Sequence, residues 1–367
     1  QSRSDRQNCG IRTVDGKEAA EQSDMSSEPF LQVQQSRGDH LAYDRSTPFI
    51  LSATAYAAHV SDIMARICRV LDKPDKEKYY RERFENIKKA FNEAWVCSDG
   101  SIEYWGEMSI SDRDDNGNII NKTYYSEKNP NSHPSQTAYA LAIDFGLIPE
   151  KLMKNTALFF KRSIDERCGC LSVGFLGISH LAPALEKAGL TDIAYKLLKN
   201  EKNPGWLYSV INGATTIWER WNSYVAETGE FGNALMNSFN HYSYGAIGEW
   251  LFSSILGINS SEKNGETGYR RIILKPVFSS ELAWARGWHE SPCGKIKSNW
   301  SIEGNCITYE CSIPANTSAM MILPDVQIKC VKGKNYIKSA KTDADDKKRF
   351  ELLSGNYKFI FGEQNNV

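Results

Sequence analysis

The stretch "STPFILSATAYAAHVSDIMARICRVLDKP", residues 46–74, has the pattern of a long amphipathic helix. A Ser-Thr pair suits a helix cap, and Pro48 suits the first helical position. Apolar residues then recur at spacings of three and four, which puts them on one face of a helix. They are Phe49, Ala53, Tyr56, Val60, Ile63, Ile67 and Leu71. Pro74 opens a second helix, in which Tyr80, Phe84, Ile87, Phe91 and Trp95 repeat the same period. Because the connection is short, the two helices are predicted to form an antiparallel hairpin.

More helical hairpins are predicted after a polar interruption. Residues 97–133 hold Gly, Asn, Asp and short alternating pieces, which suit a hairpin or a long loop. Helical patterns resume in "SQTAYALAIDFGL" (135–147), "PEKLMKNTALFFKRSID" (149–165), "LGISHLAPALEKAG" (176–189) and "TDIAYKLLKN" (191–200). We also expect one helix over "NALMNSFNHYSYGAIGEWLFSSILG" (233–257). The pattern as a whole indicates about seven or eight helices arranged in hairpins.

The composition changes near residues 259–268. Short β-branched and aromatic runs follow, separated by Gly, Pro and Asn, as in an all-β sandwich. The runs are "YRRIILKPV" (269–277), "LAWARGWHES" (282–291), "GKIKSNWSIEGNCITYECSIP" (294–314), "TSAMMILP" (317–324) and "NYKFIFG" (356–362). We therefore expect a poorly structured lead-in over residues 1–36, a helical domain over 37–260 and an antiparallel β-sandwich over 265–362.

Composition excludes some classes of function. The 367 residues contain 44 basic and 45 acidic side chains, and no Lys/Arg block stands out, so the chain lacks the footprint of a nucleic-acid-binding protein. No apolar run is long enough to cross a membrane, so we expect a soluble chain. Nine scattered cysteines are an odd number, which favours reduced thiols and a cytoplasmic location.

Two short motifs are weak candidates for metal sites. "CGC" at residues 168–170 has no second Cys/His pair to complete a tetrahedral site. "DRDDNGN" at residues 112–118 begins like a calcium loop, but Thr123 stands where a bidentate Glu is expected. A hairpin turn at Asn116-Gly117 explains the second motif better. We predict neither a metal nor a cofactor.

The stretch "GATTIWERWNSY" (213–224) places a carboxylate, Glu219, between two tryptophans. The small residues before it permit a close backbone approach, and Trp218 and Trp221 offer flat apolar faces on which a sugar can stack. A carboxylate among aromatic rings is suited to acid/base chemistry. The plainer alternative is that the tryptophans fill the core while Glu219 pairs with Arg220 at the surface.

A second candidate lies about twenty residues downstream, in "NSFNHYSYG" (237–245). His241 stands there between Asn240 and Tyr242, among small residues that leave room for a ligand. The alternative is that His241 is a histidine buried in the core and binds no ligand.

Together, "GATTIWERW" and "NSFNHYSYGAIGEW" resemble the signature of bacterial and fungal α-L-rhamnosidases of glycoside hydrolase family 78. "RGDHLAYDRSTP" (37–48), "SQTAYALA", "SVGFLG" (172–177) and the tail from "YRRIILKPV" to "TSAMMILP" resemble that family too, in the same order. The resemblance covers residues 37 to about 325. It implies an (α/α)6 barrel of helical hairpins followed by a C-terminal β-sandwich.

The resemblance also implies a reaction. Terminal α-L-rhamnose would be removed from a rhamnoside by an inverting mechanism, in which one carboxylic acid protonates the leaving oxygen and another carboxylate activates water. Glu219 is similar to the general base of the family, and His241 to a histidine that contacts rhamnose. Asp39 falls in the family's "GDW" motif, where His40 replaces the tryptophan. The expected substrate-binding residues are His241, Asp39, His40, Trp218, Trp221, Arg220 and Asn240.

One departure concerns the general acid. The family's acidic segment, which resembles D-x-P-x-R-x-E-R-x-G-W-x-G-D, is not found in residues 1–36, so the chain resembles the C-terminal part of a rhamnosidase with an incomplete barrel. We therefore expect these residues alone to be nearly inactive. The alternatives are a hydrolase of another glycoside on the same barrel, a non-catalytic sugar-binding protein and a helical scaffold. No nucleic-acid or membrane partner is expected, and the oligomeric state is left open.

Overall fold

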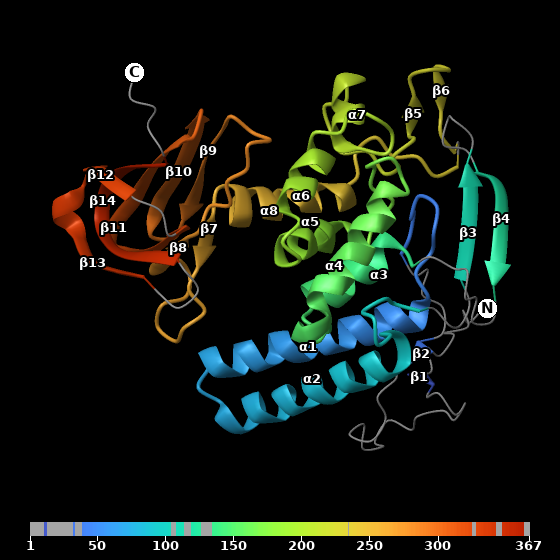
Figure 1. The fold of residues 1–367 in the computed structure, drawn as a ribbon, viewed down its shortest axis with the longest axis horizontal. Coiled ribbons are helices and arrows are strands. Elements are labelled where there is room, and N and C mark those ends of the chain that lie inside the picture. The colour runs from blue at the N-terminus through green and yellow to red at the C-terminus, as the bar shows by residue number, and fades with distance from the viewer. Residues whose placement is uncertain are drawn as a thin grey trace, which may run out of the picture. The chain divides into compact units, whose positions relative to one another are not determined.

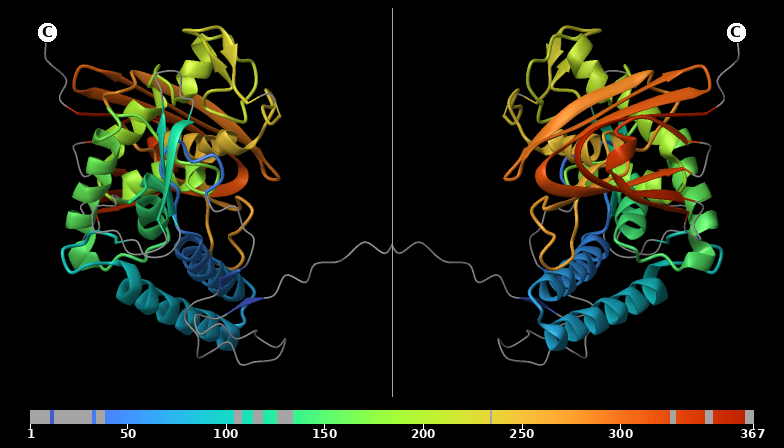
Figure 2. Two further views of the ribbon diagram at one scale, coloured as in Figure 1. Left: turned by 90° about the vertical axis from the view of Figure 1, so that its right-hand side faces the viewer. Right: turned by 90° about the vertical axis from the view of Figure 1, so that its left-hand side faces the viewer.

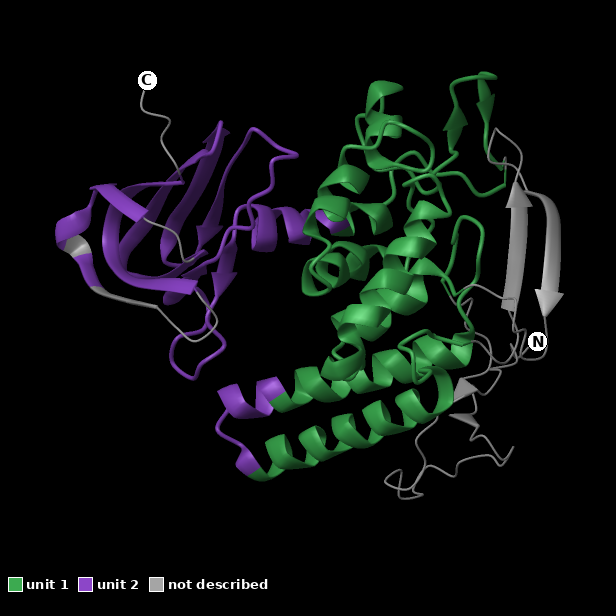
Figure 3. Cartoon of the chain, in the orientation of Figure 1, with its two compact units in different colours: residues 1–65, 75–246 green, residues 66–74, 247–367 purple. Residues whose placement is uncertain are grey.

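A computed structural model describes residues 11–12, 32–33, 39–103, 108–113, 119–125, 134–233, 235–324, 328–342 and 347–362. The chain divides into two compact units (Figure 3). Unit 1 comprises Gln1–Ala65 and Asp75–Ala246, and unit 2 comprises Arg66–Pro74 and Ile247–Val367. Most of the predicted lead-in over residues 1–36 lies outside the described residues. Its described parts are β1 (Ile11–Arg12) and β2 (Gln32–Val33), which pair with each other.

Helices make up most of unit 1 (Figure 1). They are α1 (Phe49–Val70), which continues into unit 2, α2 (Pro74–Trp95), α3 (Gln136–Asp144), α4 (Glu150–Asp165), α5 (Ile178–Lys187), α6 (Thr191–Leu198), α7 (Trp206–Ile211) and the 3-10 helix η1 (Ser243–Ala246). Two short hairpins complete the unit: β3 (Met108–Arg113) with β4 (Ile119–Tyr125), and β5 (Tyr224–Val225) with β6 (Glu230–Phe231). The helical hairpins and the hairpin within residues 97–133 are thus confirmed.

The first hairpin, α1 with α2, is confirmed, although the apolar face assigned to α1 is partly wrong (Figures 1 and 2). Val60, Ile67 and Leu71 are exposed by 54%, 44% and 58%. The helix instead buries Leu51 and the small side chains of Ala55, Ala58, Ala65 and Cys68. Small side chains permit closer packing against a neighbour, and none of these was counted in the predicted face. In α2, Ile87, Phe91 and Trp95 are buried as expected.

The helix α3 forms the centre of unit 1. Its side chains from Gln136 to Ile143 are all buried, and Ser135 caps its N-terminus by accepting a hydrogen bond from the backbone N–H of Ala138 at 3.1 Å. The Gln136 amide donates to the carbonyls of Ser163 and Cys170 and accepts from the N–H of Ser172 at 2.8 Å. These bonds hold the segment that follows α4 against α3.

The helix expected over residues 233–257 is wrong in its first part. Regular structure begins only at η1 and continues through α8 (Ile247–Trp250) and the π-helix η2 (Leu251–Ile255). Before η1 the chain forms turns, because asparagine side chains bind backbone groups there. Asn233 accepts from the N–H of Leu235 at 2.8 Å, and Asn237 donates to the carbonyl of Ser223 at 2.9 Å. Such bonds compete with helix formation.

Unit 2 is built on one eight-stranded sheet. Its strands are β7 (Ile258–Ser260), β8 (Arg271–Leu274), β9 (Trp284–Ser291), β10 (Gly294–Glu303), β11 (Cys306–Pro324), β12 (Ile328–Lys332), β13 (Ile337–Thr342) and β14 (Lys347–Phe361), with the 3-10 helix η3 (Lys334–Tyr336) before β13. The path runs β12-β14-β11-β10-β9, and β11 and β14 bend at a register shift between Ile313 and Ser318 (Figure 2). The β domain is confirmed, with one departure: β8 pairs with β11 in parallel.

The structure also bears on the predictions about membrane spans, metal sites and disulfide bonds. None of the helices in the described residues is long and apolar enough to cross a membrane. The same residues contain no cluster of three His, Cys, Asp or Glu side chains that could hold a metal ion. Each of their cysteines is free. The Asn116-Gly117 turn of "DRDDNGN" lies outside the described residues.

Candidate active site

Two irregular segments of unit 1 bring Glu219 and His241 together. The backbone N–H of Glu219 donates to the carbonyl of Ser238 at 2.8 Å, and the N–H of His241 donates to the carbonyl of Ile217 at 2.8 Å. The Thr216 hydroxyl adds a hydrogen bond to the carbonyl of Phe239. Residues far apart in the chain therefore lie on paired segments, 216–219 and 238–241. The segments that carry the two strongest candidates from the sequence therefore lie side by side.

The Glu219 carboxylate is fixed by one of its oxygens. Its Oε2 accepts a hydrogen bond from the N–H of Ser238 at 2.7 Å, and the side chain is half-buried. Within the described residues, Oε1 receives no hydrogen bond and is not enclosed. The turn that follows holds the residue in place, since the N–H of Arg220 donates to the Ser223 hydroxyl at 3.1 Å. An oriented carboxylate with one available oxygen can accept a proton from a bound water.

His241 lies in a stack of aromatic rings. Its imidazole is stacked between Phe175, at a ring-centre distance of 5.0 Å, and Tyr242, at 5.2 Å. Its Nδ1 accepts a hydrogen bond from the N–H of Ser243 at 3.3 Å. In the neutral imidazole this bond puts the proton on Nε2, which is then the donor available to a ligand hydroxyl.

Asp39 holds two loops together. It is 5% exposed, and its carboxylate accepts from the Thr137 hydroxyl at 2.5 Å. Three backbone N–H groups also donate to it: Gly174 at 2.9 Å, Leu176 at 2.8 Å and Gly177 at 3.2 Å. Burial raises the pKa of the Asp39 carboxyl, and these hydrogen bonds only partly offset that rise. The geometry gives Asp39 a positioning role, and its contact with a sugar stays a prediction.

The two loops held by Asp39 approach each other too closely for a side chain at Gly174. A Cβ at that position would lie 2.4 Å from the carbonyl oxygen of His40 and 2.6 Å from the N–H nitrogen of Ala42. The N–H of Phe175 donates to the carbonyl of His40 at 2.9 Å. The half-buried His40 ring meets the edge of Phe175 at 5.4 Å. Phe175 thus contacts both the His40 ring and the His241 ring.

The tryptophans beside Glu219 are buried. Trp221 stacks on Tyr244 at 3.8 Å, meets Trp206 edge-on at 5.6 Å and donates through Nε1 to the carbonyl of Val173 at 3.2 Å. Trp218 meets the edge of Phe239 at 5.3 Å. Their exposed fractions are 6% for Trp221 and 7% for Trp218. The rings pack against protein, so a sugar contact of either tryptophan stays a prediction.

Arg220 directly follows the first paired segment, and Asn240 lies within the second. Arg220 is half-buried, and its Nε is enclosed without a hydrogen-bond partner in the described part of the chain. Leaving a buried donor unpaired costs about 1 to 3 kcal/mol, so a ligand oxygen would find a ready partner there. Asn240 is exposed, and its N–H donates to the Ser238 hydroxyl at 3.1 Å.

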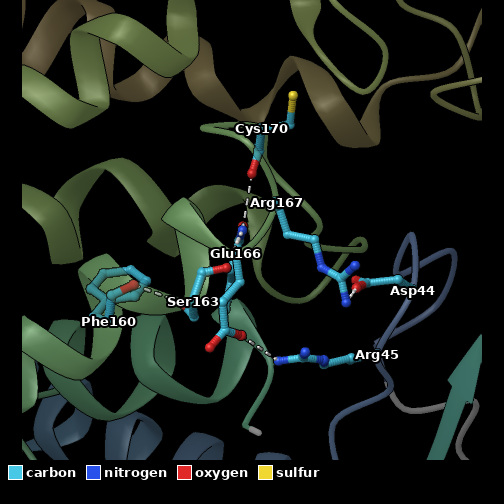
Figure 4. Close-up of polar contacts among 8 residues, drawn as sticks. Asp44, Arg45, Phe160, Ser163, Glu166, Arg167 and Cys170 are labelled. Carbon is cyan, nitrogen blue, oxygen red and sulfur yellow. Dashed lines mark hydrogen bonds and ion pairs between the residues drawn. The ribbon is translucent and has the colours of Figure 1, made fainter.

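Asp44, the other carboxylate of the 37–48 motif, is held in an ion pair (Figure 4). It is buried and pairs with Arg167, while the adjacent Arg45 pairs with Glu166 at 3.3 Å. The two pairs join the loop before α1 to the end of α4. Asp44 is therefore engaged in holding these elements together.

Phe175 and Tyr244 were not predicted from the sequence to belong to the candidate site. Phe175 contacts His241, His40 and Tyr244, and the Tyr244 hydroxyl donates to the carbonyl of Leu41 at 3.2 Å. Phe175 stands in the quoted motif "SVGFLG", and that motif was the available signal. Its role depends on contacts between distant segments, which no local pattern reveals.

Two family models together match residues 17–255 and 257–338 of the chain. Residues 17–255 match the bacterial alpha-L-rhamnosidase 6 hairpin glycosidase domain. The chain belongs to this family. Residues 257–338 match the bacterial alpha-L-rhamnosidase C-terminal domain, so the two rhamnosidase domains follow each other as the resemblance implied.

Curated members of the rhamnosidase family are moderately similar in sequence. An alpha-L-rhamnosidase of Streptomyces avermitilis is 34% identical over 298 residues, which cover 81% of this chain and 25% of that protein. One from Formosa agariphila is 33% identical over 319 residues, covering 85% of this chain and 31% of its own length. The chain thus spans about a quarter to a third of the length of these relatives.

Solved rhamnosidase structures share the fold. The crystal structure of the Streptomyces avermitilis alpha-L-rhamnosidase complexed with L-rhamnose aligns with a TM-score of 0.70 at 32% identity, covering 89% of this chain and 28% of that one. The native enzyme from Aspergillus terreus aligns with a TM-score of 0.65 at 27% identity, over 86% of this chain and 30% of the other. The six-hairpin fold with a C-terminal β domain is confirmed.

Proposed function

We propose that the chain carries the general base and a sugar-binding part of an α-L-rhamnosidase, an enzyme that removes terminal non-reducing α-L-rhamnose from rhamnosides by inversion. The observation that carries this proposal is the pairing of segments 216–219 and 238–241, which holds the backbones of Glu219 and His241 on neighbouring segments. The names of the relatives, and the rhamnose complex of one of them, support the choice of sugar.

Each residue has a step to perform in this mechanism. Glu219 accepts a proton from water through Oε1, while the N–H of Ser238 keeps Oε2 in place. The activated water attacks the anomeric carbon from the face opposite the leaving group. The Nε2–H of His241 and the guanidinium of Arg220 are available to the sugar hydroxyls. No cofactor is needed, because the reaction consumes only water and transfers protons.

The general acid is not among the residues assigned. Asp39 and Asp44 are the carboxylates of the 37–48 motif, and both are bound to other groups of the protein. The first accepts four internal hydrogen bonds, and the second pairs with Arg167. Because both carboxylates are held by these contacts, we assign the acid to another position, which in an inverting enzyme lies roughly 6.5 to 9.5 Å from the base.

Glu219→Gln tests the assignment of the base. Glutamine keeps the shape but cannot take a proton from water, so in a complete enzyme that includes the general acid, turnover of 4-nitrophenyl α-L-rhamnoside should fall by roughly two to four orders of magnitude. Affinity for L-rhamnose, measured by calorimetry, should change far less. Glu230→Gln alters an exposed carboxylate of β6 and serves as the matched control. Hydrolysis by Glu219→Gln at the rate of the unaltered complete enzyme would remove Glu219 from the mechanism.

A non-catalytic sugar-binding role is the second candidate, and the engagement of Asp39 and Asp44 favours it. It predicts that the 367 residues bind L-rhamnose but do not hydrolyse any rhamnoside. Calorimetry with L-rhamnose and the hydrolysis assay on a longer chain that contains the family's acidic segment separate the two roles, because only the first role predicts hydrolysis there. A panel of aryl glycosides of other sugars tests the remaining alternative, a different glycoside substrate.

A further inference from the structure

Two tryptophans project from the same face of the strand β9. Trp284 and Trp288 are each 59% exposed. Exposed and half-buried residues alternate along β9, and Ala285 and Gly287 are half-buried. Side chains four residues apart on a strand point to the same side and lie about 13 Å apart. The strand therefore presents two separate indole rings along one line.

The opposite face of the β9–β10 pair is packed, so the exposed tryptophans belong to a well-ordered sheet. In β10, Ile296, Ser298 and Trp300 are buried, and the Nε1 of Trp300 donates to the carbonyl of Ile255 at 2.8 Å. A Cβ at Gly287 of β9 would lie 2.3 Å from the side chain of Leu256. One face of the β9–β10 pair thus packs on the core of unit 2, and the tryptophans occupy the other face.

Basic side chains hold the two rings in position. The guanidinium of Arg286 lies over the ring of Trp284 at 5.4 Å, and the ammonium of Lys295 lies over the ring of Trp288 at 5.3 Å. Lys295 also pairs with Glu290 at 2.7 Å. Such cation–π contacts restrict the rotamers of exposed indoles. Ordered rings lose less conformational entropy on binding than mobile ones.

Across the ladder, β10 adds polar side chains to the same face. The register places Lys297 opposite Trp288, Asn299 opposite Arg286, and Ser301 opposite Trp284. We call this set the tryptophan face: Trp284, Arg286, Trp288, Glu290, Lys295, Lys297, Asn299 and Ser301. In the described part of the chain, Arg286 and Lys297 have no acidic partner. The tryptophan face therefore carries a net positive charge.

We propose that the tryptophan face is a second carbohydrate-binding surface, which takes a linear acidic polysaccharide. The C–H groups on one side of a pyranose ring pack against the electron-rich face of an indole. The two rings stand farther apart than a single pyranose can span, so their spacing suits a chain of sugars. Arg286 and Lys297 complement carboxylate or sulfate groups on that chain. The surface belongs to unit 2 and does not depend on Glu219 or on the proposed hydrolysis.

Affinity electrophoresis of the full chain tests the surface. Native gels contain polygalacturonate, a sulfated carrageenan or neutral hydroxyethylcellulose, so that the carboxylate and sulfate sources are separated. The unaltered chain should be retarded by at least one of the acidic polymers and much less by the neutral one. Trp284→Ala/Trp288→Ala should weaken that binding at least about tenfold, since each indole supplies much of the contact.

Matched variants complete the experiment. Trp288→Phe keeps a ring and should retain most of the binding, whereas Arg286→Gln/Lys297→Gln should weaken it and reduce its sensitivity to salt. Tyr79→Ala removes an exposed ring of α2 and should have no effect. The proposal is overturned if neither acidic polymer retards the chain, if the neutral polymer retards it equally, or if the double alanine variant is retarded unchanged. Sedimentation showing that the two tryptophans instead join two copies of the chain would also overturn it.

Discussion

The chain contains two pairs of closely spaced tryptophans, and their environments are opposite. Trp218 and Trp221 flank Glu219 and are exposed by 7% and 6%, whereas Trp284 and Trp288 of β9 are each exposed by 59%. The first pair contacts aromatic rings of the protein on several sides, and the second pair is contacted by basic side chains. Proximity to the proposed general base therefore does not make a tryptophan available for stacking on a sugar.

The difference follows from local structure. On a strand with one buried face, the alternation of side chains leaves every second residue on the outer face, as at Trp284 and Trp288. Trp221 instead occupies an irregular turn where Val173, Trp206 and Tyr244 converge. The buried pair is expected to affect stability, and the exposed pair binding.

Trp221→Ala should have the largest effect on stability. Removing a buried indole leaves a cavity and an unpaired carbonyl at Val173, so the free energy of unfolding should fall by about 3 to 5 kcal/mol. Urea unfolding followed by circular dichroism measures the change. A loss below about 1 kcal/mol would show that the ring faces of Trp221 are not essential to packing, and would restore it as a candidate for sugar stacking.

Asp39→Asn should test the loop that packs against Trp221, because Asp39 binds the N–H of Gly174 and the neighbouring Val173 accepts the hydrogen bond from Trp221. Asparagine cannot accept all four hydrogen bonds, so a loss of about 1 to 3 kcal/mol is expected. Because the pKa of Asp39 is raised by burial, the folded state binds its proton more tightly than the unfolded state. The contribution of Asp39 to stability is therefore fully present below its unfolded pKa and declines as the pH rises through the folded pKa.

Unfolding curves of both forms between pH 4 and 7 measure this pH dependence. The deficit of Asp39→Asn relative to the unaltered chain should be greatest near pH 4 and should shrink with rising pH. Asp72→Asn, a change at an exposed carboxylate, is the control and should show no such trend. A deficit that grows with pH would mean that the four donors outweigh burial and that the pKa of Asp39 is lowered.

His241→Ala should affect binding rather than folding. A sugar hydroxyl that loses its Nε2–H partner should weaken rhamnose binding by on the order of 1 to 3 kcal/mol. Calorimetry measures this loss, and the melting temperature should change little, because His241 is only half-buried. Unchanged rhamnose affinity together with a sharply lower melting temperature would make His241 a packing residue, like Trp221.

Trp284→Ala should have the smallest effect on stability. Its ring is mostly exposed, so the free energy of unfolding should stay within about 0.5 kcal/mol of the unaltered value. The same urea experiment used for Trp221→Ala measures it and gives a direct comparison of the two environments. A loss similar to that of Trp221→Ala would mean that β9 needs this ring for its pairing with β10.

Periodicity was sufficient to predict most of the fold. The α1–α2 hairpin and the alternating strands β9, β10 and β11 follow from spacings of three to four and of two. It failed over residues 233–242, where the Asn233 side chain binds the neighbouring backbone and Asn237 binds the distant carbonyl of Ser223. It also misplaced the buried face of α1, since alanines rather than Val60 and Ile67 are buried there.

The site was less predictable than the fold. Glu219 and His241 were identified by motif, and the structure places them on paired segments. The engagement of Asp39 and the stacking of Phe175 on His241 depend on loops that meet only in three dimensions. The exposure of Trp284 and Trp288 was not anticipated either, because a strand pattern does not reveal which face a neighbouring layer covers.

The parallel pairing of β8 with β11 has a consequence for biosynthesis. β8 ends at Leu274, and the segment of β11 that pairs with it in parallel begins at Ser318, 44 residues later by subtraction. A ribosome therefore releases β8 before the strand that completes its ladder exists. Until then one edge of β8 carries unpaired backbone groups, which are open to pairing with other nascent chains. Expression conditions that slow translation should lengthen this interval and increase the dependence of the chain on chaperones.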